Sequence, residues 1–117
     1  MCDILPRKKQ KFYTTVAANT YEIVSDIQIT VPAGKVAIIH AYGYSSQTYC
    51  TGIKIVYGND LSVNPAILST REQTDDISCL STDATFANTG TTDKYVNIAV
   101  RYKAIGTNYI GAVYFIV

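Results

Sequence analysis

The chain has 117 residues, of which 48% are hydrophobic and 16% are charged, a size and composition that fit one globular domain. Ten lysines and arginines against nine aspartates and glutamates give a formal net charge of +1, which excludes the strongly basic surface typical of nucleic-acid-binding proteins. One histidine, three cysteines and no tryptophan leave few of the groups that usually perform catalysis, so we expect a protein that is not an enzyme and uses no cofactor.

Residues 1–20 predict a basic N-terminal arm followed by a first strand. Residues 7–11 hold four cations, so the first eleven residues carry an excess of positive charge. Such an arm suits contact with neighbouring proteins, and a frayed, solvated terminus is the alternative. We expect a chain made in the cytoplasm and not inserted in a membrane, because residues 1–11 lack the apolar stretch of a secretory signal and the longest apolar run, 109–117, is far below the roughly 20 residues of a spanning helix.

The next part of the chain predicts strands, because apolar residues alternate with a period of two and no window has the spacing of an amphipathic helix. Ile27, Ile29 and Val31 alternate with polar residues, and residues 31–34 suit a tight turn. Residues 35–44 are apolar on both faces, which predicts a central strand covered on both sides. His40 lies within it and is expected in the core or in an interface.

The middle of the chain predicts shorter elements. They are a strand at 52–57, a turn at 58–60, a strand or helical turn at 66–69, strands at 77–80 and 85–87, and a loop at 88–93. The clearest pattern follows, with Val96, Ile98, Val100 and Tyr102 predicted inward and Asn97, Arg101 and Lys103 outward. Residues 106–108 predict a tight reversal into the last strand, 109–117. About eight strands with regularly spaced turns predict an all-β fold, an antiparallel β-sandwich of the jelly-roll kind over residues 21–117.

The last strand carries no charge on either face, although an outer strand of a small sandwich normally has one face in water. Leaving both faces exposed would create an apolar patch that monomers rarely tolerate. We therefore predict that one face meets neighbouring subunits, and the alternative is that the chain covers both faces itself. The predicted interface residues are Ile110, Ala112, Tyr114 and Ile116 of this strand and Ile39 of the strand at 35–44.

Two segments carry a resemblance. The sequence IQITVPAGK at 27–35 and the sequence NYIGAVYFIV at 108–117 resemble the beginning and the last strand of tumour necrosis factor-like jelly rolls, and of phage head fibres, capsid decoration proteins and tail-fibre tips of similar trimeric design. The resemblance implies a homotrimer on a virion surface. Its implied partners are further copies of the chain, other virion proteins through residues 1–11, and a host cell-surface glycan bound during receptor recognition.

A group of tyrosines supplies the candidate ligand site. Tyr42, Tyr44 and Tyr49 flank a polar loop, and a tyrosine ring with its hydroxyl suits sugar or protein recognition. Asn59 and Asp60 in the following turn complete the candidate set. An alternative function is therefore a carbohydrate-binding module that acts as a monomer.

The remaining polar residues predict no chemistry. Cys50 and Cys79 are expected to be reduced and partly buried, with a disulfide between them left open. Asp83, Asn88 and Asp93 could offer oxygens to calcium, but their spacing matches no compact calcium loop, so we expect solvated turn residues.

Overall fold

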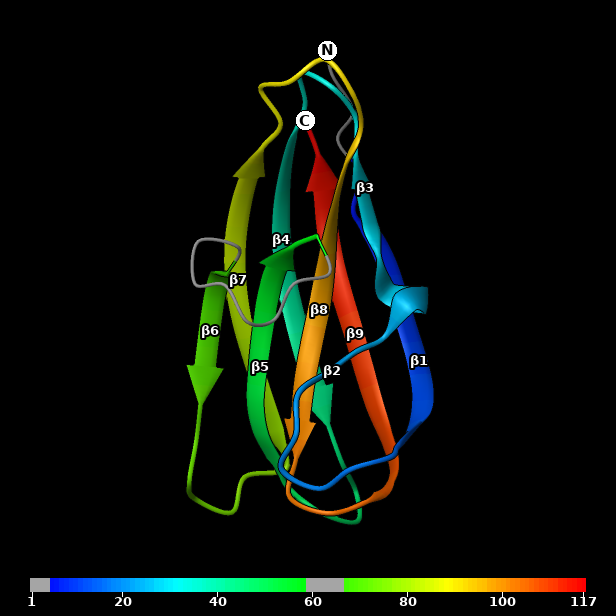
Figure 1. Ribbon diagram of the computed structural model, residues 1–117, viewed down its shortest axis with the longest axis vertical. Helices are drawn as coiled ribbons and strands as arrows, with labels where there is room; N and C mark the ends of the chain where they lie inside the picture. Colours follow the sequence, from blue (N-terminus) through cyan, green and yellow to red (C-terminus); the bar gives the residue numbers. More distant parts are fainter. Residues whose placement is uncertain (1–4, 59–66) are drawn as a thin grey trace.

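The computed structural model describes residues 5–58 and 67–117, which form two antiparallel β-sheets packed face to face (Figure 1). The elements of this described part, in chain order, are β1 (Arg7–Thr15), β2 (Glu22–Ile23), the 3-10 turn η1 (Ser25–Ile27), β3 (Ile29–Val31), β4 (Val36–Tyr44), β5 (Cys50–Tyr57), β6 (Ile67–Glu72), β7 (Cys79–Ala87), β8 (Lys94–Tyr102) and β9 (Gly106–Ile116).

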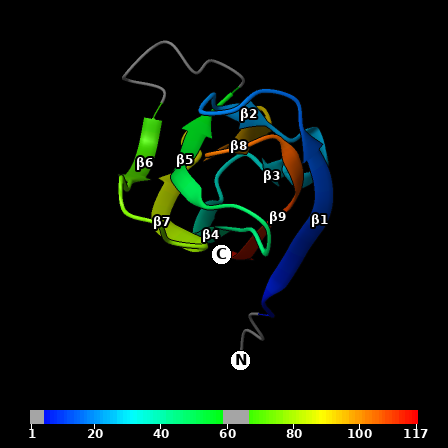
Figure 2. The ribbon, with the colours of Figure 1, turned by 90° about the horizontal axis from the view of Figure 1, so that it is seen from below.

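The order of the strands identifies a jelly roll. The first sheet runs β1-β9-β4-β7 and the second runs β2-β8-β5-β6, with β3 also paired to β8. Strands far apart in the sequence are therefore neighbours, as two Greek keys folded into a double sheet require. Figure 2 shows the two sheets from one end, with β4 and β9 opposite β5 and β8. The predicted fold class, an all-β antiparallel sandwich, is confirmed.

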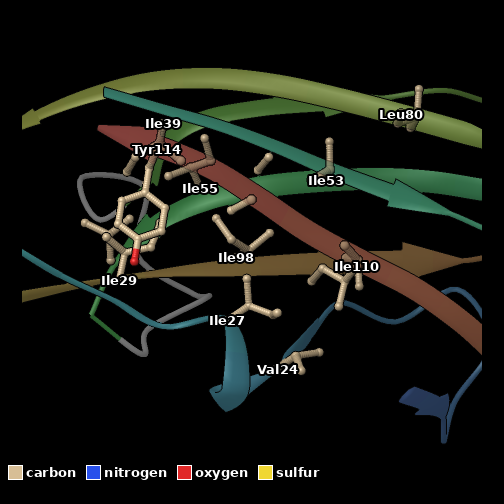
Figure 3. Close-up of a cluster of buried hydrophobic side chains, with 14 of the residues drawn as sticks. Val24, Ile27, Ile29, Ile39, Ile53, Ile55, Leu80, Ile98, Ile110 and Tyr114 are labelled. Carbon is tan, nitrogen blue, oxygen red and sulfur yellow. The ribbon is translucent and has the colours of Figure 1, made fainter. Parts of the chain in front are cut away.

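The core lies between the sheets and follows from strand alternation, since every second side chain of a strand points to the same face. Large side chains of the second sheet, such as Ile53, Ile55 and Ile98, point into the core (Figure 3), and small residues of β4, such as Ala37 and Ala41, belong to the same buried cluster. All five are fully buried. The small residues of β4 let the two sheets approach closely, and the larger residues opposite fill the space between them.

Gly43 shows how tightly one end of this core is packed. A Cβ atom at Gly43 would lie only 3.0 Å from both the Cys50 sulfur and the Tyr102 hydroxyl. That hydroxyl donates to the Tyr109 carbonyl at 2.5 Å, which ties β8 to β9 across the sandwich. Burial raises the pKa of Tyr102 above its ordinary value, so the hydroxyl keeps its proton and remains a donor.

Several predicted elements match the structure and others differ. The turn after Val31 is present, with Gly34 at a φ of 76°, and β4 is a central strand between β9 and β7. It was predicted to be covered on both sides, but the side with Ile38, His40 and Tyr44 is exposed. The two short strands predicted at 77–80 and 85–87 are one strand, β7, because pairing with β4 continues through the polar residues between them. The reversal before β9 falls at residues 103–105, ahead of the predicted 106–108.

Two further differences concern polar side chains. Asn97 was predicted to point outward but is fully buried, and its amide donates to the Gly58 carbonyl at 2.9 Å. The basic segment at 7–11 lies in β1, paired with β9 along its length. Lys9 donates to the Gln28 carbonyl at 2.5 Å and Lys11 forms an ion pair with Asp26, so these two cations are held against the body of the domain.

Among the residues the structure describes, no helix has the length and apolar character needed to cross a bilayer.

Candidate assembly face and candidate ligand-binding hollow

The side chains of the first sheet that point away from the core form a continuous surface, called here the outer face. Because paired residues of an antiparallel sheet share a face, the strand registers define its members. They are Lys8, Gln10 and Phe12 of β1, Tyr109, Gly111, Val113 and Phe115 of β9 with Val117 after it, Val36, Ile38, His40, Tyr42 and Tyr44 of β4, and Cys79, Ser81, Asp83, Thr85 and Ala87 of β7.

The upper half of the outer face, towards the C-terminus in Figure 1, is apolar. Ile38 is paired with Phe115, and Val117 lies beyond them against Val36. Ile38 remains 47% exposed and Val117 40% exposed. A shallow hollow of about 370 Å³ opens here between β7, β4 and β9, lined in part by Ile38, Val113 and Phe115. An exposed hydrophobic surface of this kind is a typical protein contact site.

One charged row crosses the outer face. His40 pairs with Asp83 on one side and Val113 on the other, and Val113 pairs with Lys8. The Nδ1 atom of His40 lies 2.6 Å from a carboxylate oxygen of Asp83. His40 was expected in the core or in an interface, and within this chain it is exposed, because it points to the opposite side of β4 from Ile39. Among the described residues paired with His40 and Asp83 across the sheet, none supplies the third group of a catalytic triad.

The lower half of the outer face is aromatic. Phe12, Tyr109 and Tyr44 form a row across β1, β9 and β4, and the rings of Phe12 and Tyr109 meet edge to face with centroids 4.3 Å apart. Tyr42 lies flat over Gly111, where a Cβ atom would come within 2.8 Å of its ring, and its hydroxyl donates to Gln10 at 2.8 Å. Burial raises the pKa of Tyr42, so this hydroxyl is a donor at neutral pH.

The predicted interface residues lie on the other side of the sheet, and that prediction is wrong as to face. Ile110, Ala112 and Ile39 are no more than 1% exposed and Tyr114 is 6% exposed, all within the core of their own chain. Ile116 is partly buried against the same cluster. Figure 3 shows Ile110 and Tyr114 pointing between the sheets. The chain covers this one face itself, with the second sheet and not with a loop or the N-terminal segment, and it leaves the other face partly exposed.

A second candidate site lies at the lower end of the sandwich in Figure 1, where the β1–β2, β4–β5, β6–β7 and β8–β9 connections gather. A hollow of about 390 Å³, called here the lower hollow, opens beside the outer side of the second sheet. Its lining residues are Asn19, Thr51, Gln73, Thr74, Arg101 and Lys103. All six are polar and none is acidic.

Arg101 is the most firmly held member of the lower hollow. Its Nε donates to the Thr51 hydroxyl and its Nη2 to the Thr51 carbonyl, both at 3.0 Å. The guanidinium also lies over the ring of Tyr21, 4.8 Å from the centroid, and 3.8 Å from a carboxylate oxygen of Glu72. Four constraints on one guanidinium fix its orientation before any ligand arrives.

The predicted ligand residues do not form one platform. Tyr42 and Tyr44 belong to the outer face, whereas Tyr49 lies in the β4–β5 connection, 36% exposed, with the Lys103 ammonium 5.3 Å from its ring. Asn59 and Asp60 lie outside the described residues. Sequence reasoning placed Arg101 and Lys103 outward but did not join them to Gln73 and Thr74, because only the folded chain brings the two segments together.

The cysteines and acidic residues offer no further site among the described residues. Cys50 and Cys79 are both free thiols, Cys50 buried as expected and Cys79 exposed on the outer face, contrary to prediction. Burial raises the pKa of the Cys50 thiol to about 11. The side-chain amide of Asn88 donates to the Val31 and Thr92 carbonyls. Within residues 5–58 and 67–117, no three potential metal ligands lie together.

Comparison with known proteins adds little. No family model matches the chain, and no curated protein matches it. One solved structure that it resembles is described by the words "Bacillus endospore appendages form a novel family of disulfide-linked pili". The two share 15% sequence identity over 96% of this chain and 86% of that one, with a TM-score of 0.44. This similarity is too low to support a fold or a function, and the jelly-roll assignment rests on the strand order.

Proposed function

We propose that this jelly roll is a non-catalytic structural protein of a phage virion that assembles as a homotrimer on the particle surface, as a head fibre, capsid decoration protein or tail-fibre tip. The observation that carries the proposal is the set of exposed apolar and aromatic side chains on the outer face of the β1-β9-β4-β7 sheet, on both sides of the His40–Asp83 pair. The jelly-roll topology supports the virion part, because capsid domains commonly use it. The proposed subunit interface is the outer face and not the inward-pointing side of β9, because residues on that side, such as Ile110 and Tyr114, fill the core of their own chain.

Burial of the exposed apolar side chains on this face favours association. Phe12 is 64% exposed, Ile38 47% and Tyr44 43%. Full burial of a large apolar side chain is worth about 1.5–3 kcal/mol, so covering the exposed halves of these residues contributes roughly 1 kcal/mol each. Together with Val113, Phe115 and Val117 each copy brings several kcal/mol, which has to exceed the loss of translational and rotational freedom.

Light scattering coupled to size exclusion tests the proposal. The wild-type chain is expected to elute with three times its 12.8 kDa mass at micromolar concentration. Ile38→Glu places a charge in the centre of the outer face and is expected to give monomers that keep the native circular dichroism spectrum. The matched control is Ile105→Glu, since Ile105 is 64% exposed in the β8–β9 connection, outside the outer face, and is expected to leave the trimer intact.

Two results would contradict the proposal. A wild-type chain that stays monomeric at high micromolar concentration removes self-assembly altogether. Equal loss of assembly in Ile38→Glu and Ile105→Glu leaves self-assembly standing but rejects the outer face as its site.

A further inference from the structure

The lower hollow is built for a ligand whose chemistry can be read from its lining. Its volume of about 390 Å³ falls in the range of about 300–1,000 Å³ typical of small-molecule sites. Four separate chain segments supply its walls at one end of the sandwich (Figure 1), where a jelly roll can vary its connections without disturbing the core. The outer face lies on the other sheet, so assembly there leaves this hollow open.

Two cations in the lining call for a negative charge on the ligand. Arg101 donates two of its N–H groups to Thr51 and lies 3.8 Å from a carboxylate oxygen of the half-exposed Glu72, so its nearest carboxylate is beyond hydrogen-bond distance. A guanidinium has five N–H groups, arranged to bind a carboxylate with two parallel bonds. Lys103 joins it from the following turn, paired at 3.1 Å with the exposed carboxylate of Asp76. Both partners of that ion pair are more than half exposed, so the pair is weak enough for the ammonium to turn to another anion.

The rest of the lining suits hydroxyl groups. Gln73 is anchored through its backbone, whose N–H donates to the Thr51 carbonyl at 3.1 Å, and its side-chain amide lines the hollow with both a donor and an acceptor. The hydroxyl of Thr74 and the amide of Asn19 add further donors and acceptors. Asn19 is held in the left-handed region with a φ of 56°, and its backbone N–H donates to the Tyr102 carbonyl.

An aromatic ring lies beside the hollow, next to one of its lining residues. The ammonium of Lys103, which lines the hollow, is 5.3 Å from the centroid of the Tyr49 ring, and the Lys103 N–H donates to the Tyr49 carbonyl at 2.9 Å. Its partly exposed ring offers an apolar surface for the C–H face of a sugar ring.

We propose that the lower hollow binds an acidic sugar, with the carboxylate on Arg101 and Lys103, hydroxyls on Gln73 and Thr74, and the sugar ring against Tyr49. This inference adds a ligand class to the proposed function, on which it rests, namely an acidic sugar of the host cell-surface glycan expected from the sequence. It does not require the trimer.

The test uses the full chain and defined sugars. Binding of glucuronic acid and N-acetylneuraminic acid is measured by NMR chemical-shift titration, beside glucose as the neutral counterpart and inorganic sulfate as the anion without a sugar ring. We expect both acidic sugars to bind at least tenfold more tightly than glucose and sulfate, with the largest shifts at residues of the hollow. Lys103→Gln and Gln73→Ala are each expected to weaken binding about tenfold, while Lys35→Gln, at the opposite end of the sandwich, leaves it unchanged.

Each alternative outcome rejects the proposal in a different way. Equal affinity for glucuronic acid and sulfate means an anion site without sugar recognition, and equal affinity for glucose means that the cations are not used. No binding of any probe removes the site. Light scattering on the same samples separates this result from assembly, since a trimer that binds no sugar contradicts only the sugar site and a monomer that binds one contradicts only the trimer.

Discussion

Replacing Gly52 by alanine tests how the β1–β2 connection is fixed to the second sheet. Gly52 lies in β5 beneath the ring of Tyr21, and a Cβ atom there would come within 2.7 Å of the ring carbon Cζ and still closer to the hydroxyl. The backbone of β5 is held by neighbours on both sides, so the tyrosine has to move. The ring is expected to swing out into solvent.

The cost follows from the contacts that Tyr21 gives up. Its hydroxyl donates to Glu72 at 2.9 Å, and the cations of Lys54 and Arg101 lie 4.2 and 4.8 Å from its ring centroid. A partly exposed hydrogen bond is worth about 1 kcal/mol and an exposed cation–π contact about 0.5–1 kcal/mol. Alanine in place of glycine raises the free energy of unfolding by roughly 0.5–1 kcal/mol, because glycine loses more backbone entropy than alanine when a strand forms. The net expected loss in the free energy of unfolding is about 1–2 kcal/mol.

A double-mutant cycle measured by urea unfolding isolates this mechanism. Gly52→Ala, Tyr21→Ala and the double variant are compared with the wild type. In the Tyr21→Ala background the alanine at position 52 meets no ring, so it is expected to be neutral or slightly stabilising. Burial raises the pKa of Tyr21 in the wild type, so in Gly52→Ala one more tyrosine is expected to ionise near its ordinary pKa of about 10. The same destabilisation in both backgrounds would refute the reasoning.

Three further predictions use the core and the thiols. In urea unfolding of the monomer, Ile110→Ala is expected to lower the free energy of unfolding by about 2–5 kcal/mol and Ile38→Ala by less than about 1 kcal/mol, because of these two side chains only that of Ile110 is fully buried. Equal losses in the two variants would place both side chains in the core. In the monomeric variant Ile38→Glu, a thiol reagent at pH 8 is expected to label Cys79 within minutes and Cys50 only after unfolding, because Cys50 is buried and its pKa is raised to about 11. Mass spectrometry of labelled peptides measures this, and fast labelling of both thiols would contradict it. The thiol titrates near 9 in the unfolded chain and near 11 in the folded one, so the contribution of Cys50 to the free energy of unfolding is complete below pH 9 and falls by about 2–3 kcal/mol as the pH rises through 11. In Cys50→Ala the free energy of unfolding is therefore expected to fall less steeply with pH between 9 and 11. An unchanged dependence on pH would exclude Cys50 as the cause.

The fold class could be predicted because the strands of this chain obey simple alternation. Val96, Ile98, Val100 and Tyr102 recur with a period of two and are all fully buried. Boundaries were less predictable where polar residues lie inside a strand. Ser81–Ala84 look like a break in the sequence but form the middle of β7, because pairing to β4 satisfies their backbone whatever their side chains are.

The face of the last strand that stays exposed could not be predicted from that strand alone, because both of its faces are free of charge and a period of two does not say which is inside. The residues of the neighbouring strand β4 distinguish the inner face from the outer one. Ala37, Ala41 and Gly43 are small, which signals close approach of another layer, and that layer is the second sheet of the same chain. His40, Tyr42 and Tyr44 on the opposite side carry polar atoms that are cheap to leave in water.

The same reasoning explains why the two proposed surfaces are independent. The outer face is made by strand positions of the first sheet, so its side chains are set by the alternation that also builds the core. The lower hollow is made by connections and by the ends of β5 and β8 in the second sheet, so its residues can change without altering that alternation. Ile38→Glu is therefore expected to abolish assembly without changing sugar binding, and Lys103→Gln to weaken sugar binding without changing assembly. Coupled loss of both properties in either variant would mean that the two surfaces form one site.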